Sequence, residues 1–141
     1  MEALLIFLKT LEGRFLIDML LATTLGYIIG LERESRDKDA GIGTHIMVLC
    51  GATLYTLLST LIDPTSRSRI AAQIVTGIGF LGAGLILKEE GLKIKNLTTA
   101  SSIWFAGAIG MALGFGYYSI AIIAAFFSVV IPRISRFGKK N

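Results

Sequence analysis

Long apolar runs separated by short charged segments dominate the pattern of residues along the chain. The stretch from Arg14 to Glu32 holds one internal charge, residues 40–62 contain no Asp, Glu, Lys or Arg, and residues 70–87 contain no ionisable side chain. Residues 96–132 form a further run of 37 uncharged residues. Since about 20 helical residues cross a hydrocarbon core about 30 Å thick, each run is long enough to span a membrane.

The last run is too long for one span, because as a single helix it would extend about 55 Å at about 1.5 Å per residue. Its segment Gly114–Tyr118, GFGYY, favours a turn, with flexible glycines beside tyrosines that suit the membrane–water interface. The pattern therefore predicts an all-α integral membrane protein with a bundle of about five transmembrane helices. The expected spans, within a transmembrane domain of residues 14–134, are 15–31, 44–62, 70–87, 97–114 and 117–132.

The charged segments predict how the bundle is oriented. Ten basic residues would lie on one side of a five-span bundle and four on the other; the ten are Arg33, Arg36, Lys38, Lys88, Lys93, Lys95, Arg133, Arg136, Lys139 and Lys140. The positive-inside rule then places the C-terminus in the cytoplasm and the N-terminus outside. Residues 1–13 are expected to form a short interfacial segment without the features of a signal peptide. Residues 135–141 are expected to be a basic cytoplasmic tail with no soluble C-terminal domain after it.

Composition narrows the function classes. The chain is 53% hydrophobic and 17% charged, and its net charge of +4 reflects basic residues that flank spans, which indicates a topology signal and no nucleic-acid partner. The single Cys50 excludes an intramolecular disulfide. With one histidine, His45, and no G-x-S-x-G segment, the sequence offers neither a zinc site nor a nucleophile–base pair, so we expect no enzyme.

Small residues recur along three of the expected spans and predict close helix packing, because they let two backbones approach each other in lipid. We expect the first, third and fourth spans at the centre of the bundle and the bulkier second and fifth spans nearer the lipid. The ridges are also compatible with a homo-oligomer. The expected helix-packing positions are Ala22, Gly26, Gly30, Gly77, Gly79, Gly82, Gly84, Gly110 and Gly114.

The stretch TGIGFLGAG, residues 76–84, has the G-x-G-x-x-G spacing of a dinucleotide-binding loop, but its context is wrong for one. Such a loop follows a strand and has an acidic residue about 20 positions later, whereas these glycines lie inside an apolar run with no acid there. We interpret them as helix-packing positions at which the third span presses against the first and fourth. Unwinding of the helix around a solute stays open as the alternative.

Polar residues in or near the spans are candidate functional groups. The amide of Gln73 would bridge to a neighbouring helix or line a polar pocket, and Asp18 would pair with Arg14 at the interface or bind a cation. Thr98 and Thr99 would cap the fourth span or contribute to a binding site. In the first cytoplasmic loop, the carboxylates form a solvated ion-pair network or a weak Mg²⁺ site; the candidate ligands are Glu32, Glu34 and Asp37.

Three blocks of sequence resemble the MgtC/SapB family of small bacterial inner-membrane proteins. The first block is LGYIIGLERE at 25–34 with AGIGTH at 40–45, the second is RIAAQIVTGIGFLGAG at 69–84, and the third is LTTA at 97–100 with Trp104 and Gly110. The blocks cover about residues 15–114, and they contain Arg33, Thr44 and His45 as further candidate residues. Gly43 stands where many members have Arg, and Asn96 where a Gly is common.

The resemblance implies a multi-pass protein of the bacterial cytoplasmic membrane whose main partner is the lipid bilayer. Family members are associated with growth under magnesium limitation, with acid or other stress, with virulence, and with restraint of the F-type ATP synthase. We therefore expect a regulatory protein that contacts another membrane complex, without a cofactor other than a weakly bound Mg²⁺. A transporter or channel for Mg²⁺ or another small solute is the alternative.

Overall fold

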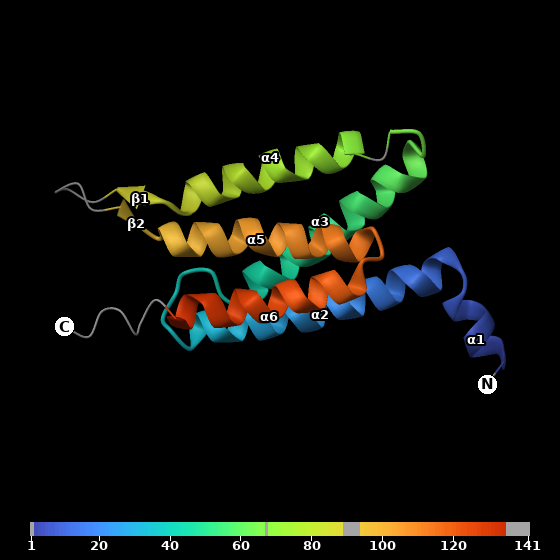
Figure 1. The fold of residues 1–141 in the computed structure, drawn as a ribbon, viewed down its shortest axis with the longest axis horizontal. Helices are drawn as coiled ribbons and strands as arrows, with labels where there is room; N and C mark the ends of the chain where they lie inside the picture. Colours follow the sequence, from blue (N-terminus) through green and yellow to red (C-terminus); the bar gives the residue numbers. More distant parts are fainter. Residues whose placement is uncertain (1, 67, 89–93, 135–141) are drawn as a thin grey trace.

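The computed structural model describes residues 2–66, 68–88 and 94–134, which form a bundle of helices (Figure 1). The helices are α1 (Glu2–Leu8), α2 (Leu11–Glu34), α3 (Ile42–Ile62), α4 (Ser68–Leu85), α5 (Leu97–Gly114) and α6 (Tyr118–Ile134). The predicted helical fold is confirmed. One small departure is an antiparallel pair of two-residue strands, β1 (Leu87–Lys88) and β2 (Ile94–Lys95), in which Leu87 pairs with Lys95.

Within the described part of the chain, α2, α3 and α5 are long and apolar enough to cross a membrane, and α4 and α6 are shorter apolar helices. Their connections alternate between the two ends of the bundle (Figure 1). The α2–α3 connection, the β1–β2 pair and the end of α6 lie at one end, which we call the loop end. The chain start and the α3–α4 and α5–α6 connections lie at the other. The described parts of the charged segments that we predict on one side of the membrane therefore share one end of the bundle.

The centre of the bundle is formed by α3 and α5, which corrects the expected order of the spans. Helix α3 packs against α2, α4 and α5, while α5 packs against α3, α4 and α6. Helix α4 packs against α5, as expected, but its second neighbour is α3, where we expected the first span. The second span is central because the small residues of α2 and α5 face it from both sides.

Four glycines set these close approaches. A Cβ on Gly26 would lie 2.7 Å from the Cα of Ile46, and one on Gly110 would lie 2.5 Å from the carbonyl oxygen of Leu49. Gly30 meets the α3 backbone in the same way, as does Gly114. Since a side chain at any of the four would collide with backbone, these glycines fix the distance of α2 and α5 from α3.

The glycines of α4 behave differently, and this corrects a second expectation. A Cβ on Gly77, Gly79 or Gly84 would meet nothing within 4 Å, and one on Gly82 would make an ordinary 3.7 Å contact with Ala100. Three of the four glycines in TGIGFLGAG therefore have no packing role among the described residues. The spacing of small residues did not reveal which face of α4 is turned to the bundle; that face carries Ile74 and Ile78.

The turn between α5 and α6 is confirmed at GFGYY. Gly116 has φ +82°, its N–H donates to the carbonyl of Leu113, and the N–H of Tyr117 donates to the carbonyl of Ala112. This pair of bonds is a Schellman motif, in which a residue with positive φ closes the helix. The motif reverses the chain within the long uncharged run, as its length required.

Replacement of Gly110 by alanine is expected to lower the free energy of unfolding by about 1–3 kcal/mol, because the new Cβ overpacks the α3–α5 contact. Gly43→Ala is the matched control, since a Cβ there meets nothing within 4 Å. Reversible unfolding in mixed micelles of detergent and dodecyl sulfate measures both variants. Equal stability of the two variants would contradict the proposed role of Gly110.

Candidate functional site

A buried polar cluster lies where α2, α3 and α5 meet near the loop end. We define the polar cluster as Glu32, Arg33, His45, Thr99 and Ser102, all of which are buried. The last turn of α2 supplies the two charged residues, the first turns of α3 supply the histidine, and α5 supplies the two hydroxyls. Three expected candidate residues from the first sequence block, Glu32, Arg33 and His45, are thus brought together with Thr99 from the third block.

Arg33 is the largest side chain in the polar cluster and is only 1% exposed. Its Nη2 donates a 2.9 Å hydrogen bond to Oγ1 of Thr99, while its Nε has no hydrogen-bond partner among the described residues. A guanidinium without water needs such donors placed against acceptors, because burial of a charge is otherwise expensive. Arg33 therefore ties the end of α2 to the start of α5.

Glu32 is buried beside two arginines. Its Oε1 accepts from Nη1 of Arg36 at 3.3 Å and lies 3.7 Å from Nε of Arg133, near the end of α6. Its Oε2 is buried without a hydrogen bond to any described residue. With Arg33 next to it in the chain, this single carboxylate sits among three guanidinium groups, so the local charge is positive.

His45 makes polar contacts through both ring nitrogens, one with the N-cap of its own helix and one with α5. Its Nδ1 donates to the carbonyl oxygen of Gly41 at 2.9 Å, and its Nε2 lies 3.3 Å from Oγ of Ser102. The hydroxyl of Ser102 donates to the carbonyl of Thr99 at 2.8 Å. Since Arg33 donates to the hydroxyl of that same threonine, a continuous chain of polar contacts runs from α3 to α2 through α5.

The remaining loop acids make separate contacts with the backbone and with side chains nearby. Oε1 of Glu34 accepts from the N–H of Ile42 at 2.8 Å and so caps α3, and Asp39 accepts a hydrogen bond from the amide of Asn96. Asp37 is exposed at a positive φ of 53°. Among the described residues no three His, Cys, Asp or Glu side chains gather as metal ligands. The three Mg²⁺ candidates, Glu32, Glu34 and Asp37, thus have different surroundings in the structure.

Asp18 forms a second polar group at the opposite end of α2. It is 0% exposed, its Oδ1 accepts a 2.8 Å hydrogen bond from the hydroxyl of Tyr118, and its Oδ2 lies 3.9 Å from Nε of Arg14. The expected partner, Arg14, is therefore present, but at a distance too long for a hydrogen bond. The closer partner is a tyrosine on α6, which sequence spacing did not indicate because it lies 100 residues away.

Two of the polar candidates are not where the sequence suggested. The side chain of Gln73 is exposed on α4 and bridges to no described residue, so the interhelical bridge is wrong. The N-cap of α5 is Asn96, which makes no side-chain cap hydrogen bond, so Thr98 and Thr99 do not cap the helix. Thr98 is exposed, whereas Thr99 is buried in the polar cluster.

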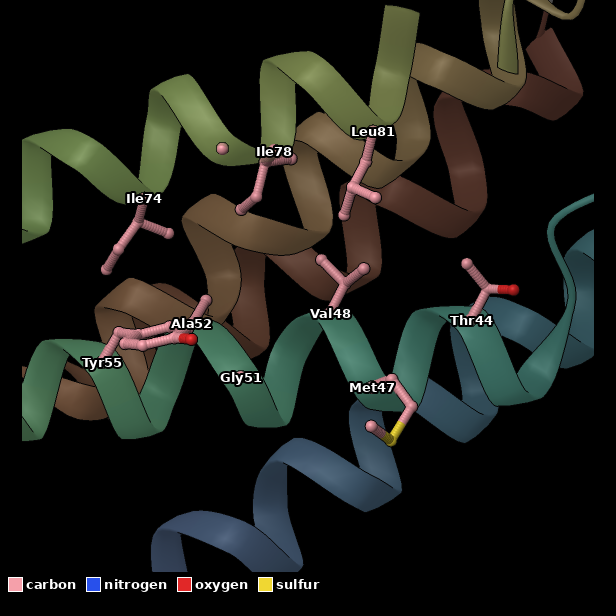
Figure 2. Close-up of a pocket in the computed structure, with 10 residues that line it drawn as sticks. Thr44, Met47, Val48, Gly51, Ala52, Tyr55, Ile74, Ile78 and Leu81 are labelled. Carbon is pink, nitrogen blue, oxygen red and sulfur yellow. The ribbon is translucent and has the colours of Figure 1, made fainter. Parts of the chain in front are cut away.

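An apolar groove of about 430 Å³ separates α3 from α4. Ile74, Ile78 and Leu81 project from α4 toward α3, and Val48 projects from α3 toward α4 (Figure 2). Thr44 lines the same groove near the start of α3 (Figure 2). The wall positions Gly51 and Gly77 have nothing within 4 Å of an added Cβ. The groove therefore opens outward, with two glycines that leave room for an incoming group.

Several residues that matter in these sites were missed by sequence reasoning as site residues. They are Arg36 and Arg133 beside Glu32, Tyr118 beside Asp18, and Ser102 beside His45. Ser102 was visible as part of a hydroxyl-rich start of the fourth span. For Arg133 the only signal was a basic flank, which is expected after any span that ends in the cytoplasm.

Comparison with known proteins gives a consistent assignment. The model of the MgtC family matches residues 19–140. The chain is 43% identical over 110 residues to "Protein MgtC" of Salmonella typhimurium strain LT2, a match that covers 78% of this chain and 47% of the relative. It is 41% identical over 116 residues to "Protein MgtC" of Brucella abortus strain 2308, covering 82% and 48%.

The chain spans about half the length of the curated relatives it matches. No solved structure gives a significant match. The family match covers α3 to α6, α2 from residue 19 onward and the whole polar cluster, whereas Asp18 lies just before its start. The chain therefore belongs to the MgtC family.

Proposed function

We propose that this chain is a regulatory protein of the bacterial cytoplasmic membrane that acts by contact with another membrane complex, such as the F-type ATP synthase. It responds to magnesium limitation or acid stress, as the family resemblance implies. The observation that carries the proposal is the open groove between α3 and α4, with Gly51 and Gly77 on its walls. A partner helix gains contact by close approach of backbones, and small residues permit this.

A transporter is the alternative, and the interior of the bundle gives it little support. A conduction path needs polar groups around an internal cavity at mid-membrane. Thr53, which lies there, donates instead to the carbonyls of Leu49 and Gly110, and Thr24 donates to the carbonyl of Leu20 on its own helix. The described cavities are outward grooves with mainly apolar linings.

Catalysis is also poorly supported, and so is a resident Mg²⁺. Ser102 lies near His45, but its hydroxyl proton is directed to the carbonyl of Thr99 and away from the ring nitrogen that would have to accept it. Glu32 faces Arg36 and Arg133, whose positive charge repels a divalent cation. We therefore infer a non-enzymatic protein without a metal cofactor.

The proposed topology has five spans, an outside N-terminus and a cytoplasmic loop end. In a Cys50→Ser background, Ser35→Cys places a thiol in the α2–α3 connection and Thr65→Cys places one in the α3–α4 connection, both at exposed positions. A membrane-impermeant maleimide added to intact spheroplasts is expected to label Thr65→Cys at once and Ser35→Cys only after permeabilisation. The reverse pattern would invert the topology, and equal labelling would refute the span count between the two sites.

The contact proposal predicts that filling the α3–α4 groove abolishes regulation without unfolding the bundle. Inverted membrane vesicles that contain the chain are expected to show reduced ATP-driven proton pumping, and Gly77→Leu is expected to restore pumping to the level of vesicles without it. Gly43→Leu, at another open glycine outside the groove, is the matched control and should still inhibit. Pumping that is insensitive to the chain at equal expression would remove the ATP synthase as partner.

Flux measurements separate the regulator from the transporter. Purified chain in liposomes loaded with a Mg²⁺-sensitive dye is expected to give the same Mg²⁺ entry as empty liposomes. Gln73→Leu serves as the companion variant, because Gln73 is the one amide side chain of α4 and a solute path along this helix would pass it. Saturable entry that this substitution abolishes would replace the regulatory function with transport.

A further inference from the structure

A second groove, between α5 and α6, is separate from the α3–α4 groove used above. Its volume is about 390 Å³, and it runs along α5 from Thr98 to Phe105, a length of about 10 Å at about 1.5 Å per residue. Trp104 on α5 and Phe127 on α6 line it, and both are about half exposed on the outer surface of the bundle. In a membrane this groove therefore faces the acyl chains.

The groove carries a polar group that the fold itself does not use. Ser128 on α6 lines it and is only 6% exposed, yet its hydroxyl makes no hydrogen bond to any described residue. Ser101 lines the opposite wall. An unpaired hydroxyl in an apolar groove is unfavourable, so an occupant with acceptor oxygens at this depth would stabilise it.

The mouth of the groove, at the loop end, is positive. Thr98, Ile131 and Pro132 line this mouth, and Arg133 follows directly in the chain with a side chain that is 61% exposed. Helix α5 also begins close to this mouth, at Asn96, whose amide donates to Asp39 and makes no side-chain cap. The charge that complements this end is an anion, and the apolar length behind it suits a hydrocarbon chain.

We propose that the α5–α6 groove binds one anionic phospholipid. Its phosphate lies at the mouth beside Arg133 and the start of α5, its ester oxygens lie level with Ser101 and Ser128, and one acyl chain continues past Trp104. Basic sites between membrane helices on the cytoplasmic side recognise lipid headgroups in this way. The site does not involve the α3–α4 groove, so it stands or fails independently of the proposed regulatory contact.

The test uses the fluorescence of Trp104, which is the single tryptophan of the chain and lies in the groove. The protein is reconstituted in phosphatidylcholine vesicles, and rising fractions of phosphatidylglycerol with brominated acyl chains are compared with brominated phosphatidylcholine. We expect half-maximal quenching at about a five-fold lower fraction of the anionic lipid, the preference that roughly one basic side chain confers. Equal quenching by the two lipids would overturn the proposal, because lipid that only surrounds the bundle shows no preference.

Three variants test whether the preference for the anionic lipid arises in the α5–α6 groove. Arg133→Gln is expected to bring the ratio close to one, and Ser128→Phe, which fills the groove, is expected to do the same. Ser119→Phe is the matched control, since Ser119 is exposed on α6 and does not line the groove. If Ser128→Phe fails to fold, Ser101→Phe at the exposed wall replaces it. A ratio unchanged in Arg133→Gln, or displacement of the brominated lipid by inorganic phosphate, would contradict a lipid site.

Discussion

The contact between the backbones of α3 and α5 is the interaction on which the rest of the structure depends. Between helices in lipid there is no strong hydrophobic force, so association relies on dispersion contacts and interhelical hydrogen bonds. Gly110 and Gly114 bring the two backbones together, and the hydroxyl of Thr53 adds a hydrogen bond across the contact to the carbonyl of Gly110. With α3 held there, α2 can pack on its other side through Gly26 and Gly30, and α4 and α6 can pack against α5. The peripheral helices are thus placed by one central pair.

The same pair explains why charged groups can be buried near the loop end. Because α3 and α5 begin beside the end of α2, the start of α5 places the hydroxyl of Thr99 against Arg33 and that of Ser102 beside His45. The charge-assisted hydrogen bond from Arg33 to Thr99 is stronger than a neutral one, and loss of its acceptor would leave an expensive unpaired charge. The polar cluster therefore specifies the register of three helices at the end where their apolar surfaces finish. Within the same region, Glu32 faces the guanidinium groups of Arg36 and Arg133.

The sequence predicted the helical class, the turn at GFGYY and the close packing at Gly26, Gly30, Gly110 and Gly114, because hydropathy and small residues on one face are local properties. It did not predict which helix is central. A small residue permits close approach but does not name the partner, so the open glycines of α4 could not be distinguished from the packed glycines of α5. The sequence identified most members of the polar cluster as candidate residues. It could not predict which of them touch, since Arg33 and Thr99, for example, are 66 residues apart. For Arg133, which lies beside Glu32, the sequence offered one signal, a basic residue directly after a span. Most membrane helices share that signal, so it does not identify a partner.

These features together favour a protein that works at its outer surfaces. The polar residues within the bundle are mostly engaged: Thr53 bonds to the backbone of α5, Asp18 bonds to Tyr118, and Arg33 bonds to Thr99. What remains open lies outside, in the groove between α3 and α4 and the groove between α5 and α6. The interior of the bundle thus provides rigidity, and its outer surface provides the places where another molecule can bind. Tight, polar-locked packing gives a rigid bundle, and a rigid bundle is what allows shallow apolar grooves to keep a shape that a partner helix or a lipid can recognise.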